Sequence, residues 1–463
     1  MGVKSKTVFV CQECGYESPK WLGQCPCGAW NSFVEEKLLP DSDSDIRRRG
    51  SSKKSIAPVP TALPKVSARA SRRIDTKIGE LNRVLGGGLV EGSLCLISGE
   101  PGIGKSTMII QAAANIAQSV GPVLYVSGEE SEEQIKLRAD RVCGGDLSNL
   151  YLLSETNMEA VIEAEEKLKP SFLVIDSIQT MYSDGIDSAP GSVSQVRACG
   201  NMLMNIGKGQ NIPVFIVAHV TKSGELAGPK IVEHMVDAVL QFNGERSRDL
   251  RILRAIKNRF GTTSEIGAFE MREEGLVEIE NISKIFLEGL EDSEEGALAT
   301  AVYEGTRPLL LEIQALTSPC NIGFARRSAV GIDAQRLGMI IAVLERKCKL
   351  TLLNKDVYVN VVGGLRPEGT ATDLGVALAI WSDDKGYKIP VDLLAIGEIG
   401  LTGDLRPVQN AEKLVKEAGR MGFKSVILPK RNADKISADG IKLIGVKTLS
   451  EALTVSSQIS QKI

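Results

Sequence analysis

The sequence predicts a multidomain α/β protein whose largest part is a parallel sheet that binds phosphate. The 463 residues are enough for about three domains. Apolar runs such as 94–98 and 172–176 alternate with helical stretches, which is typical of a parallel sheet covered on both faces. The segment 99–106 matches the phosphate-binding pattern GxxxxGK[ST], with an apolar run before it and a helix after it.

Composition and charge narrow the class of protein. The chain is 43% apolar and its formal net charge is −3, so any contact with nucleic acid must come from a local patch or channel. No apolar run reaches the roughly 18 residues that span a bilayer, and the first residues lack the features of a signal peptide. We therefore expect a cytoplasmic protein with no membrane partner. The nine cysteines, an odd number, argue against a disulfide framework in that compartment.

Four segments follow one another along the chain. Residues 1–34 are rich in Cys, Gly and Trp and are too short to hold a core without a staple. Residues 35–65 combine charge runs with spaced prolines, which predicts a flexible linker. Residues 66–272 contain the strand–loop–helix pattern, and residues 291–463 form a second α/β unit.

The sequence pattern predicts the main strands and helices of the two α/β units. Buried strands are predicted in the first unit at 94–98, 122–127, 172–176 and 213–218. A helix begins at Lys105, and Ser131 with Gln134 forms a capping box for another. Antiparallel edge hairpins are expected at 235–241, 250–256 and 266–271. In the second unit, we expect strands at 309–316, 357–364, 393–401 and 425–429 and helices at 373–382 and 411–421.

The phosphate loop is the most specific motif. Its glycines let backbone N–H groups turn toward phosphate oxygens at the positive end of a helix dipole. Lys105 is expected to reach the terminal phosphates of ATP, and Ser106 to offer its hydroxyl to Mg²⁺. The predicted nucleotide contacts are Gly99, Glu100, Pro101, Gly102, Ile103, Gly104, Lys105, Ser106 and Thr107.

Acidic residues at two other strand ends complete the predicted catalytic set. Asp176 ends the strand 172–176 and is expected to orient Mg²⁺. Glu129 and Glu130 directly follow the strand 122–127, at the carboxyl edge of the sheet where ligands gather. One of them is expected to position the attacking water, with a slight preference for Glu130. Charge at a helix entry is the alternative for both.

Four cysteines near the start predict a structural zinc site. Cys11 and Cys14 form CxxC, and Cys25 and Cys27 follow after ten intervening residues. Four thiolates in a short segment without a core indicate Zn²⁺. Redox thiols or a metal-free site are the alternatives.

Further motifs in a fixed order complete the pattern: YVSGEES, the segment 217–230, the pentapeptide KNRFG at 257–261, and a tail similar to Lon protease. Together with the cysteine segment and the phosphate loop, they resemble the bacterial RadA (Sms) family of DNA repair proteins across nearly the whole chain. The resemblance implies a RecA-like P-loop NTPase core between a zinc finger and a Lon-protease-like domain. The family has a second CxxC where this chain has Cys25-Pro26-Cys27.

The same resemblance implies a DNA-dependent ATPase of recombinational repair. Such a protein binds single-stranded DNA and drives branch migration of recombination intermediates with the RecA recombinase, and the resemblance implies a homo-oligomer that forms a hexameric ring. The KNRFG motif consists of Lys257, Asn258, Arg259, Phe260 and Gly261. Lys257 and Arg259 would act on a neighbouring subunit's ATP, as an arginine finger does. A strand-end turn with surface cations is the alternative.

Candidate DNA contacts come from loops that would face a ring channel. They are the stretch 183–195, Arg197, and the loop after His219 with Lys222 and Lys230. Backbone phosphates would carry most of the affinity. His219 is expected either to sense the γ-phosphate or to be a structural histidine.

The tail lacks the residues that proteolysis requires. In register with Lon protease, Ala371 stands where the nucleophilic Ser belongs and Glu412 where the Lys belongs. Thr370, Thr372 and Lys413 are out of register. We expect an assembly platform and an additional DNA surface, with loose candidates Arg326, Arg327, Arg336 and Lys347. An ATP-dependent protease and a nucleotide-gated adaptor without translocation are the rival functions.

Overall fold

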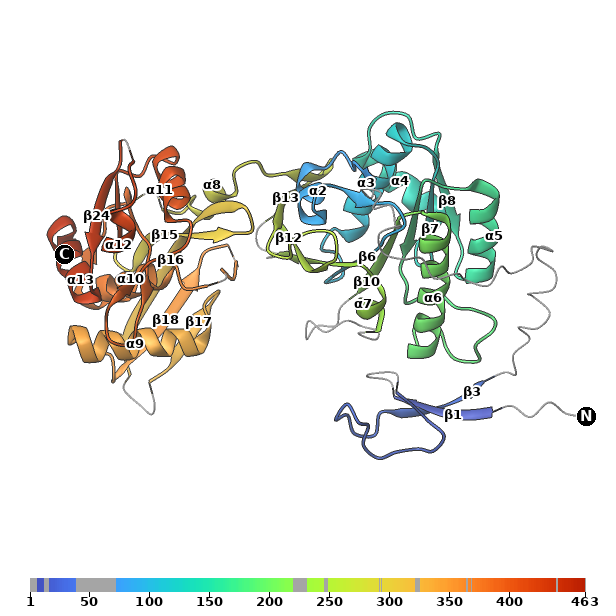
Figure 1. Ribbon diagram of the computed structural model, residues 1–463, viewed down its shortest axis with the longest axis horizontal. Helices are drawn as coiled ribbons and strands as arrows, with labels where there is room; N and C mark the ends of the chain where they lie inside the picture. The colour runs from blue at the N-terminus through green and yellow to red at the C-terminus, as the bar shows by residue number, and fades with distance from the viewer. Residues whose placement is uncertain are drawn as a thin grey trace, which may run out of the picture. The chain divides into compact units, whose positions relative to one another are not determined.

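The computed structural model consists of two compact units, Met1–Glu278 and Ile279–Ile463 (Figure 1). The structure describes residues 6–11, 16–38, 72–219, 231–244, 249–290, 292, 294–320, 325–363, 365–367, 369–438 and 440–462. Cys14, Lys222 and Lys230 lie outside these ranges. Within them, none of the helices combines the length and apolar character that a bilayer span requires.

A nine-stranded sheet organises the described part of the first unit. Its strand order is β14-β13-β12-β11-β6-β10-β9-β7-β8. The strands from β11 to β8 pair in parallel, and β12 to β14 add an antiparallel extension. The bounds of the nine are β6 Leu94–Gly99, β7 Val123–Ser127, β8 Leu150–Ser154, β9 Phe172–Asp176, β10 Val214–His219, β11 Ala238–Gly244, β12 Leu250–Asn258, β13 Ile266–Arg272 and β14 Gly275–Glu278.

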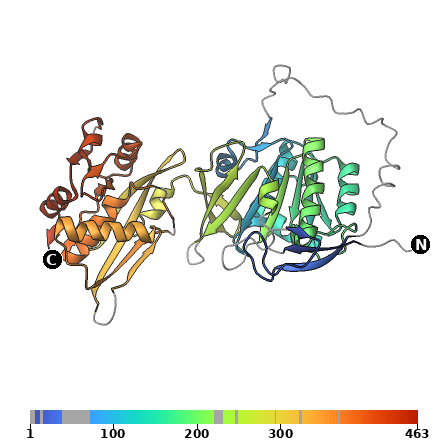
Figure 2. The same cartoon turned by 60° about the horizontal axis from the view of Figure 1, so that its bottom comes forward.

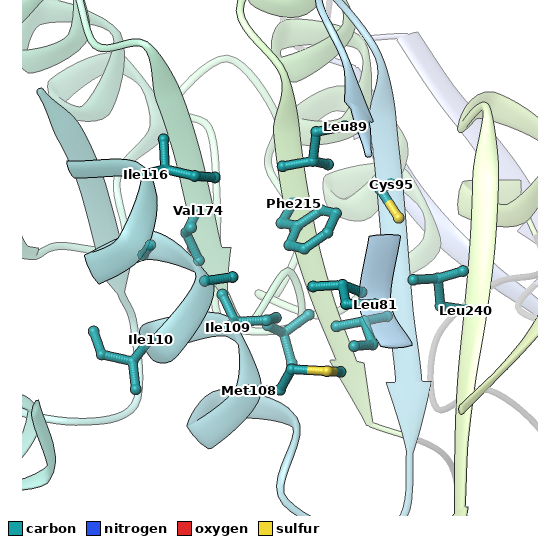
Figure 3. Packing of buried hydrophobic residues seen from close by; sticks show 14 of the residues in the cluster. Leu81, Leu89, Cys95, Met108, Ile109, Ile110, Ile116, Val174, Phe215 and Leu240 are labelled. Carbon is teal, nitrogen blue, oxygen red and sulfur yellow. The ribbon is translucent and has the colours of Figure 1, made fainter. Parts of the chain in front are cut away.

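Helices cover both faces of this sheet, as its continuous apolar strands predict. On one face, α3 (Lys105–Ser119) and α4 (Glu132–Val142) pack onto a cluster that includes Val174 and Phe215 (Figure 3). On the other face lie α5 (Met158–Leu168) and α6 (Val193–Gln210) (Figure 2). Each fully buried large side chain in these layers contributes about 1.5–3 kcal/mol. The two cores hold the strand ends at one edge rigidly in place.

Most predicted elements of the first unit are confirmed, including the capping box of Ser131 and Gln134 at the start of α4. The strand expected at 235–241 is shifted, because Ile231–Met235 form the short helix α7 and β11 begins at Ala238. Its expected pairing was also incomplete. β11 pairs in parallel with β6 and is antiparallel only to β12, because the chain crosses over through α7 before it enters the sheet.

The cysteine segment forms a small antiparallel sheet of order β2-β1-β3. Its strands are β1 Lys6–Cys11, β2 Glu17–Ser18 and β3 Phe33–Leu38. Residues 35–38, which the sequence predicts to belong to the linker, belong to β3, because they pair with residues 6–9 of β1.

The second unit is a seven-stranded mixed sheet in its described part, of order β17-β18-β16-β15-β20-β23-β24. Its strands are β15 Ala297–Glu304, β16 Arg307–Pro319, β17 Arg327–Val330, β18 Lys355–Val361, β20 Leu393–Ala395, β23 Ser425–Pro429 and β24 Lys442–Val446. Its main helices are α9 Ala334–Cys348, α10 Asp373–Lys385, α11 Ala411–Arg420 and α13 Leu449–Ile459. The predicted strand 393–401 is wrong in its second half, since Glu398–Ile399 pair instead with Leu405–Arg406 in a separate hairpin.

Candidate nucleotide and metal sites

The phosphate loop joins β6 to α3 at the carboxyl edge of the parallel sheet. Gly99 requires glycine because a Cβ there would meet the Phe242 carbonyl oxygen at 2.8 Å, and Gly104 requires it because its φ is +113°. Gly102 has φ +76° and nothing within 4 Å of its ideal Cβ position. The loop therefore leaves open space beside backbone that only glycine adopts readily, as a cradle for phosphate oxygens requires.

Lys105 is the cation of this loop. Its side chain is buried, and its Nζ donates to the carbonyl oxygens of Gly99 at 2.8 Å and Glu100 at 3.0 Å. Burial lowers the pKa of Lys105 to about 8, and the nearby carboxylates of Asp176 and Glu129 oppose that shift. The ammonium is thus already directed at the loop and has acidic partners across the site.

Asp176 ends β9, two strands from the phosphate loop in the sheet, and is buried. Its Oδ2 accepts a 2.6 Å hydrogen bond from the hydroxyl of Tyr125, a residue of β7. Ser106, in the first turn of α3, is half-buried. A hydroxyl and a carboxylate at this edge are ligands that suit Mg²⁺, which binds oxygen donors and keeps several waters.

The two glutamates after β7 have different surroundings. Glu129 accepts a hydrogen bond from the Ser177 hydroxyl and lies close enough to Lys105 to affect its pKa. Glu130 instead forms an ion pair with Arg138 on α4. The backbone N–H groups of both glutamates donate to the Ser127 hydroxyl, at 3.4 Å and 3.0 Å, which fixes the turn. Of the two, Glu129 is the one whose charge acts on Lys105 of the phosphate loop.

The KNRFG motif lies at the opposite edge of the same sheet. Lys257 pairs with Val239, which pairs with Leu96, three residues before Gly99. At about 3.3 Å per residue and about 4.8 Å between strands, Lys257 is roughly 10 Å along the sheet and roughly 10 Å across it from the loop. Arg259 follows the strand at that far edge. Neither cation is placed to contact a phosphate bound by its own chain.

Polar contacts hold this motif in shape. The Lys257 Nζ donates to the carbonyl oxygens of Glu233 at 2.7 Å and His234 at 3.3 Å, at the end of α7. Burial lowers the pKa of Lys257, and the neighbouring Arg259 adds to the shift. Arg259 pairs with the buried carboxylate of Asp237 at 3.2 Å, yet more than half of its side chain is exposed.

Asn258, Phe260 and Gly261 anchor the turn to α2 (Gly79–Leu85) and the glycines after it. The Asn258 amide donates to the Val84 carbonyl oxygen at 3.1 Å, and a Cβ on Gly261 would lie 3.0 Å from the Gly86 Cα. The motif is therefore a rigid turn that carries two cations.

The described candidate DNA residues lie around α6. The loop before this helix ends at Ser192, so the last three residues of the predicted stretch 183–195 are helical. Gln195 is buried and bonds the backbone of Ser183, Ile186 and Ser188, which fixes the loop to α6. Arg197 lies one turn beyond the N-cap of that helix and is half-buried. The backbone of His219 pairs with Gly99, which brings the end of β10 to the phosphate loop.

Three of the four predicted zinc ligands converge. The Sγ atoms of Cys11, Cys25 and Cys27 lie within 4.8 Å of one another, and the Cys11 and Cys27 sulfurs are 3.9 Å apart. Tetrahedral zinc with Zn–S bonds of about 2.3 Å places its sulfurs about 3.8 Å apart. These residues fit a zinc ion, and the shortened pair Cys25–Cys27 does not prevent convergence.

The protease-like positions of the second unit hold a salt bridge and no nucleophile. Ala371 accepts a backbone hydrogen bond from Gly397 at 2.9 Å, and Glu412 is paired with Lys416 one turn along α11. Beside them, the buried Asp373 forms an ion pair with Arg336 and accepts the Ile399 N–H at 3.0 Å. Burial raises the pKa of Asp373. Arg336, a candidate for DNA, is thus committed to a buried carboxylate.

Several contacts in the nucleotide site were missed by the sequence analysis. Tyr125, Ser177 and Arg138 each bond one of the predicted acidic residues, and Arg251 donates from β12 to the Ile103 carbonyl oxygen of the loop at 3.2 Å. A tyrosine inside the otherwise apolar strand β7 was the only signal available for any of them.

Comparison with known proteins gives full-length relatives. The chain is 51% identical over 458 residues to "DNA repair protein RadA" of Bacillus subtilis, which covers 98% of this chain and 99% of that protein. It is 49% identical to the protein of the same name from Listeria monocytogenes, over 97% of this chain and 98% of that protein.

The chain belongs to the RadA family of DNA repair proteins. Matches to three family descriptions agree with the RadA layout. They are "Rubredoxin metal binding domain" at 9–35, "AAA domain" at 59–225 and "Subunit ChlI of Mg-chelatase" at 323–432. A solved KaiC-like protein from Pyrococcus horikoshii aligns at 18% identity and TM-score 0.39, over 45% of this chain and 99% of that one. The RadA relationship, the P-loop and the cysteine cluster support an ATPase that uses ATP, Mg²⁺ and Zn²⁺.

Proposed function

We propose that this RadA-family chain is a DNA-dependent ATPase motor of recombinational repair. It binds single-stranded DNA and drives branch migration of recombination intermediates together with the RecA recombinase. The observation that carries the proposal is the position of KNRFG at the sheet edge opposite the phosphate loop. A motif of two rigidly held cations that cannot serve its own nucleotide suits a site completed between subunits.

Within one chain, the residues divide the work of phosphoryl transfer. Lys105 and the N–H groups of the loop hold the β- and γ-phosphates, and Ser106 and Asp176 hold Mg²⁺. The metal ion supplies positive charge against the phosphate oxygens. Glu129 orients the attacking water and accepts its proton, because it lies beside Lys105 whereas Glu130 is paired with Arg138.

Between chains, the proposal requires a ring, of which six subunits is the expected number. Lys257 and Arg259 of one subunit reach the γ-phosphate held by the next and neutralise the charge that develops there. In this ring, Arg197 and the loop that starts at residue 183 would face the channel, and Lys222 and Lys230, which lie outside the described residues, are the further candidate DNA contacts. A closed ring concentrates these cations around DNA although the chain as a whole is acidic.

Steady-state ATP hydrolysis with and without single-stranded oligonucleotide tests this function. We expect DNA to stimulate turnover several-fold, with a steep loss at high salt because phosphate contacts dominate. Lys105→Ala should reduce turnover by at least about 100-fold, since it removes the cation at the reacting phosphates. Turnover that persists in Lys105→Ala would place the active site elsewhere. Turnover that ignores DNA would favour a nucleotide-gated adaptor.

A further inference from the structure

A tyrosine lies in the middle of β7 of the ATPase unit, among aliphatic residues. Tyr125 is 1% exposed, and its strand neighbours Leu124 and Val126 are buried and aliphatic. Its ring packs in the same cluster as Val174 and Phe215, between the sheet and α3. A phenylalanine would fill that space equally well, so packing alone does not explain the hydroxyl.

The hydroxyl has one defined partner. It donates to the Oδ2 of Asp176 at 2.6 Å, a short bond of the kind that charged acceptors make. Tyr125 pairs with Val174 in the sheet, so the phenol extends along the strands to reach the residue two positions further on. The register of the two strands therefore sets up this hydrogen bond.

We propose that Tyr125 is a positioning residue for the magnesium ion, which acts by holding Asp176 in the orientation that the metal shell requires. This inference rests on the proposed ATPase function. Its basis is that the hydroxyl binds one of the two carboxylate oxygens, so that the other oxygen would remain for the metal ion or its waters. A free aspartate would sample several rotamers, whereas Mg²⁺ demands near-ideal octahedral geometry and penalises a misplaced ligand. Partners beyond the ligand often tune metal affinity by 10- to 100-fold.

A second hydroxyl, that of Ser177, holds the carboxylate of Glu129 in a similar way. Ser177 directly follows Asp176 and donates to Glu129. Each of the two carboxylates at the reaction centre is thus held by its own hydroxyl, one from β7 and one from the turn after β9. The ion pair between Arg138 of α4 and Glu130 lies close enough to act electrostatically on the Tyr125 hydroxyl. Arg138 thus adds a cation from α4 to this group of polar side chains.

Tyr125→Phe tests the inference, because it removes the oxygen and keeps the ring. Binding of a fluorescent, non-hydrolysable ATP analogue is measured by titration with and without Mg²⁺, on the full chain. We expect the gain in analogue affinity that Mg²⁺ provides to fall by about tenfold, while affinity without metal stays within about twofold of wild type. The Mg²⁺ concentration for half-maximal hydrolysis should rise by a similar factor, with turnover at saturating Mg²⁺ less affected. Tyr151→Phe, at an exposed position of β8, is the matched control.

The possible results separate the inference from the function on which it depends. An unchanged Mg²⁺ response in Tyr125→Phe overturns the positioning role. Equal loss of analogue binding with and without metal also overturns it, because that pattern marks a packing role. If the wild-type chain itself fails to hydrolyse ATP, the proposed function is wrong whatever the variant does. A wild type that hydrolyses ATP beside an unaffected Tyr125→Phe leaves the function standing and removes only the tyrosine's part.

Discussion

Lys105 is buried, and its ammonium is satisfied by the carbonyl oxygens of its own loop. Bringing this group to a phosphate requires only that it exchange carbonyl oxygens for phosphate oxygens, with little side-chain ordering. The carboxylates of Asp176 and Glu129 have their own hydroxyl donors, so the reaction centre is largely organised before nucleotide arrives. Preorganised charge of this kind is usually the largest contribution to catalysis.

The pKa of Lys105 leads to a prediction about pH. It is lowered to about 8 in the free protein, and phosphate favours the charged ammonium, so nucleotide binding raises it again. Nucleotide therefore binds most tightly below about pH 8, where Lys105 is charged, and its affinity falls as the pH rises above that value. Binding near pH 9 should take up protons, which calorimetry in two buffers of different ionisation enthalpy measures.

Lys105→Arg supplies the control for that titration, because arginine stays charged throughout. It should bind the analogue without the proton uptake near pH 9. Equal uptake in Lys105→Arg and wild type would show that another group titrates.

The different partners of the two glutamates also predict different phenotypes. Glu129→Gln should lower turnover by about 10²- to 10⁴-fold and leave analogue binding intact, because it removes the base and keeps the shape. Glu130→Gln is the matched control. It should lower turnover by less than about tenfold, because it only weakens the ion pair with Arg138. Single-turnover hydrolysis measures both, and a larger defect in Glu130→Gln would contradict the assignment.

At the scale of elements, the sequence predicts what is local and misses what depends on pairing. The phosphate loop and Asp176 were predicted because a strand, a turn and a helix in succession define them. The different surroundings of Glu129 and Glu130 were not predictable, since they depend on Arg138, which lies nearly two turns into α4. The far-edge position of KNRFG depends on β11 running parallel to β6, which apolar periodicity alone does not reveal.

The cysteine module carries its own prediction. Its core consists of few buried residues around Cys11, Cys25 and Phe33, so the metal must supply most of its folding free energy. Purified protein should hold one zinc per chain, and Cys27→Ala should release it at chelator concentrations at least about tenfold lower. A colorimetric zinc assay measures this release. The ATPase unit meets the module only through a small cluster of Val8, Val10 and Val193 in the described residues, so its melting temperature should change little. Wild-type protein that lacks zinc would contradict the assignment.

At the scale of the whole molecule, the proposed function assigns different tasks to the ATPase unit and to the second unit. The second unit has Ala371 and Glu412 at the positions that correspond to the protease residues, and the buried ion pair Arg336–Asp373 lies beside Ala371 in the sequence. A unit without these reactive side chains suits the expected role of an assembly platform better than that of a protease. Under the proposed function, the ATPase unit needs a second copy, because the phosphate loop and the KNRFG cations of one chain lie at opposite edges of the sheet.

The measurement that most directly tests an ATP site shared between subunits is complementation between two inactive variants. Lys105→Ala lacks the phosphate cation but keeps KNRFG, and Lys257→Ala has the reverse defect. Each alone should hydrolyse ATP at a few per cent of the wild-type rate or less. Mixed in equal amounts under exchange conditions, they should regain up to about a quarter of wild-type turnover, because about a quarter of the seams then combine an intact loop with an intact lysine. A mixture no more active than its components, or a Lys257→Ala protein with full activity of its own, would contradict a site shared between subunits.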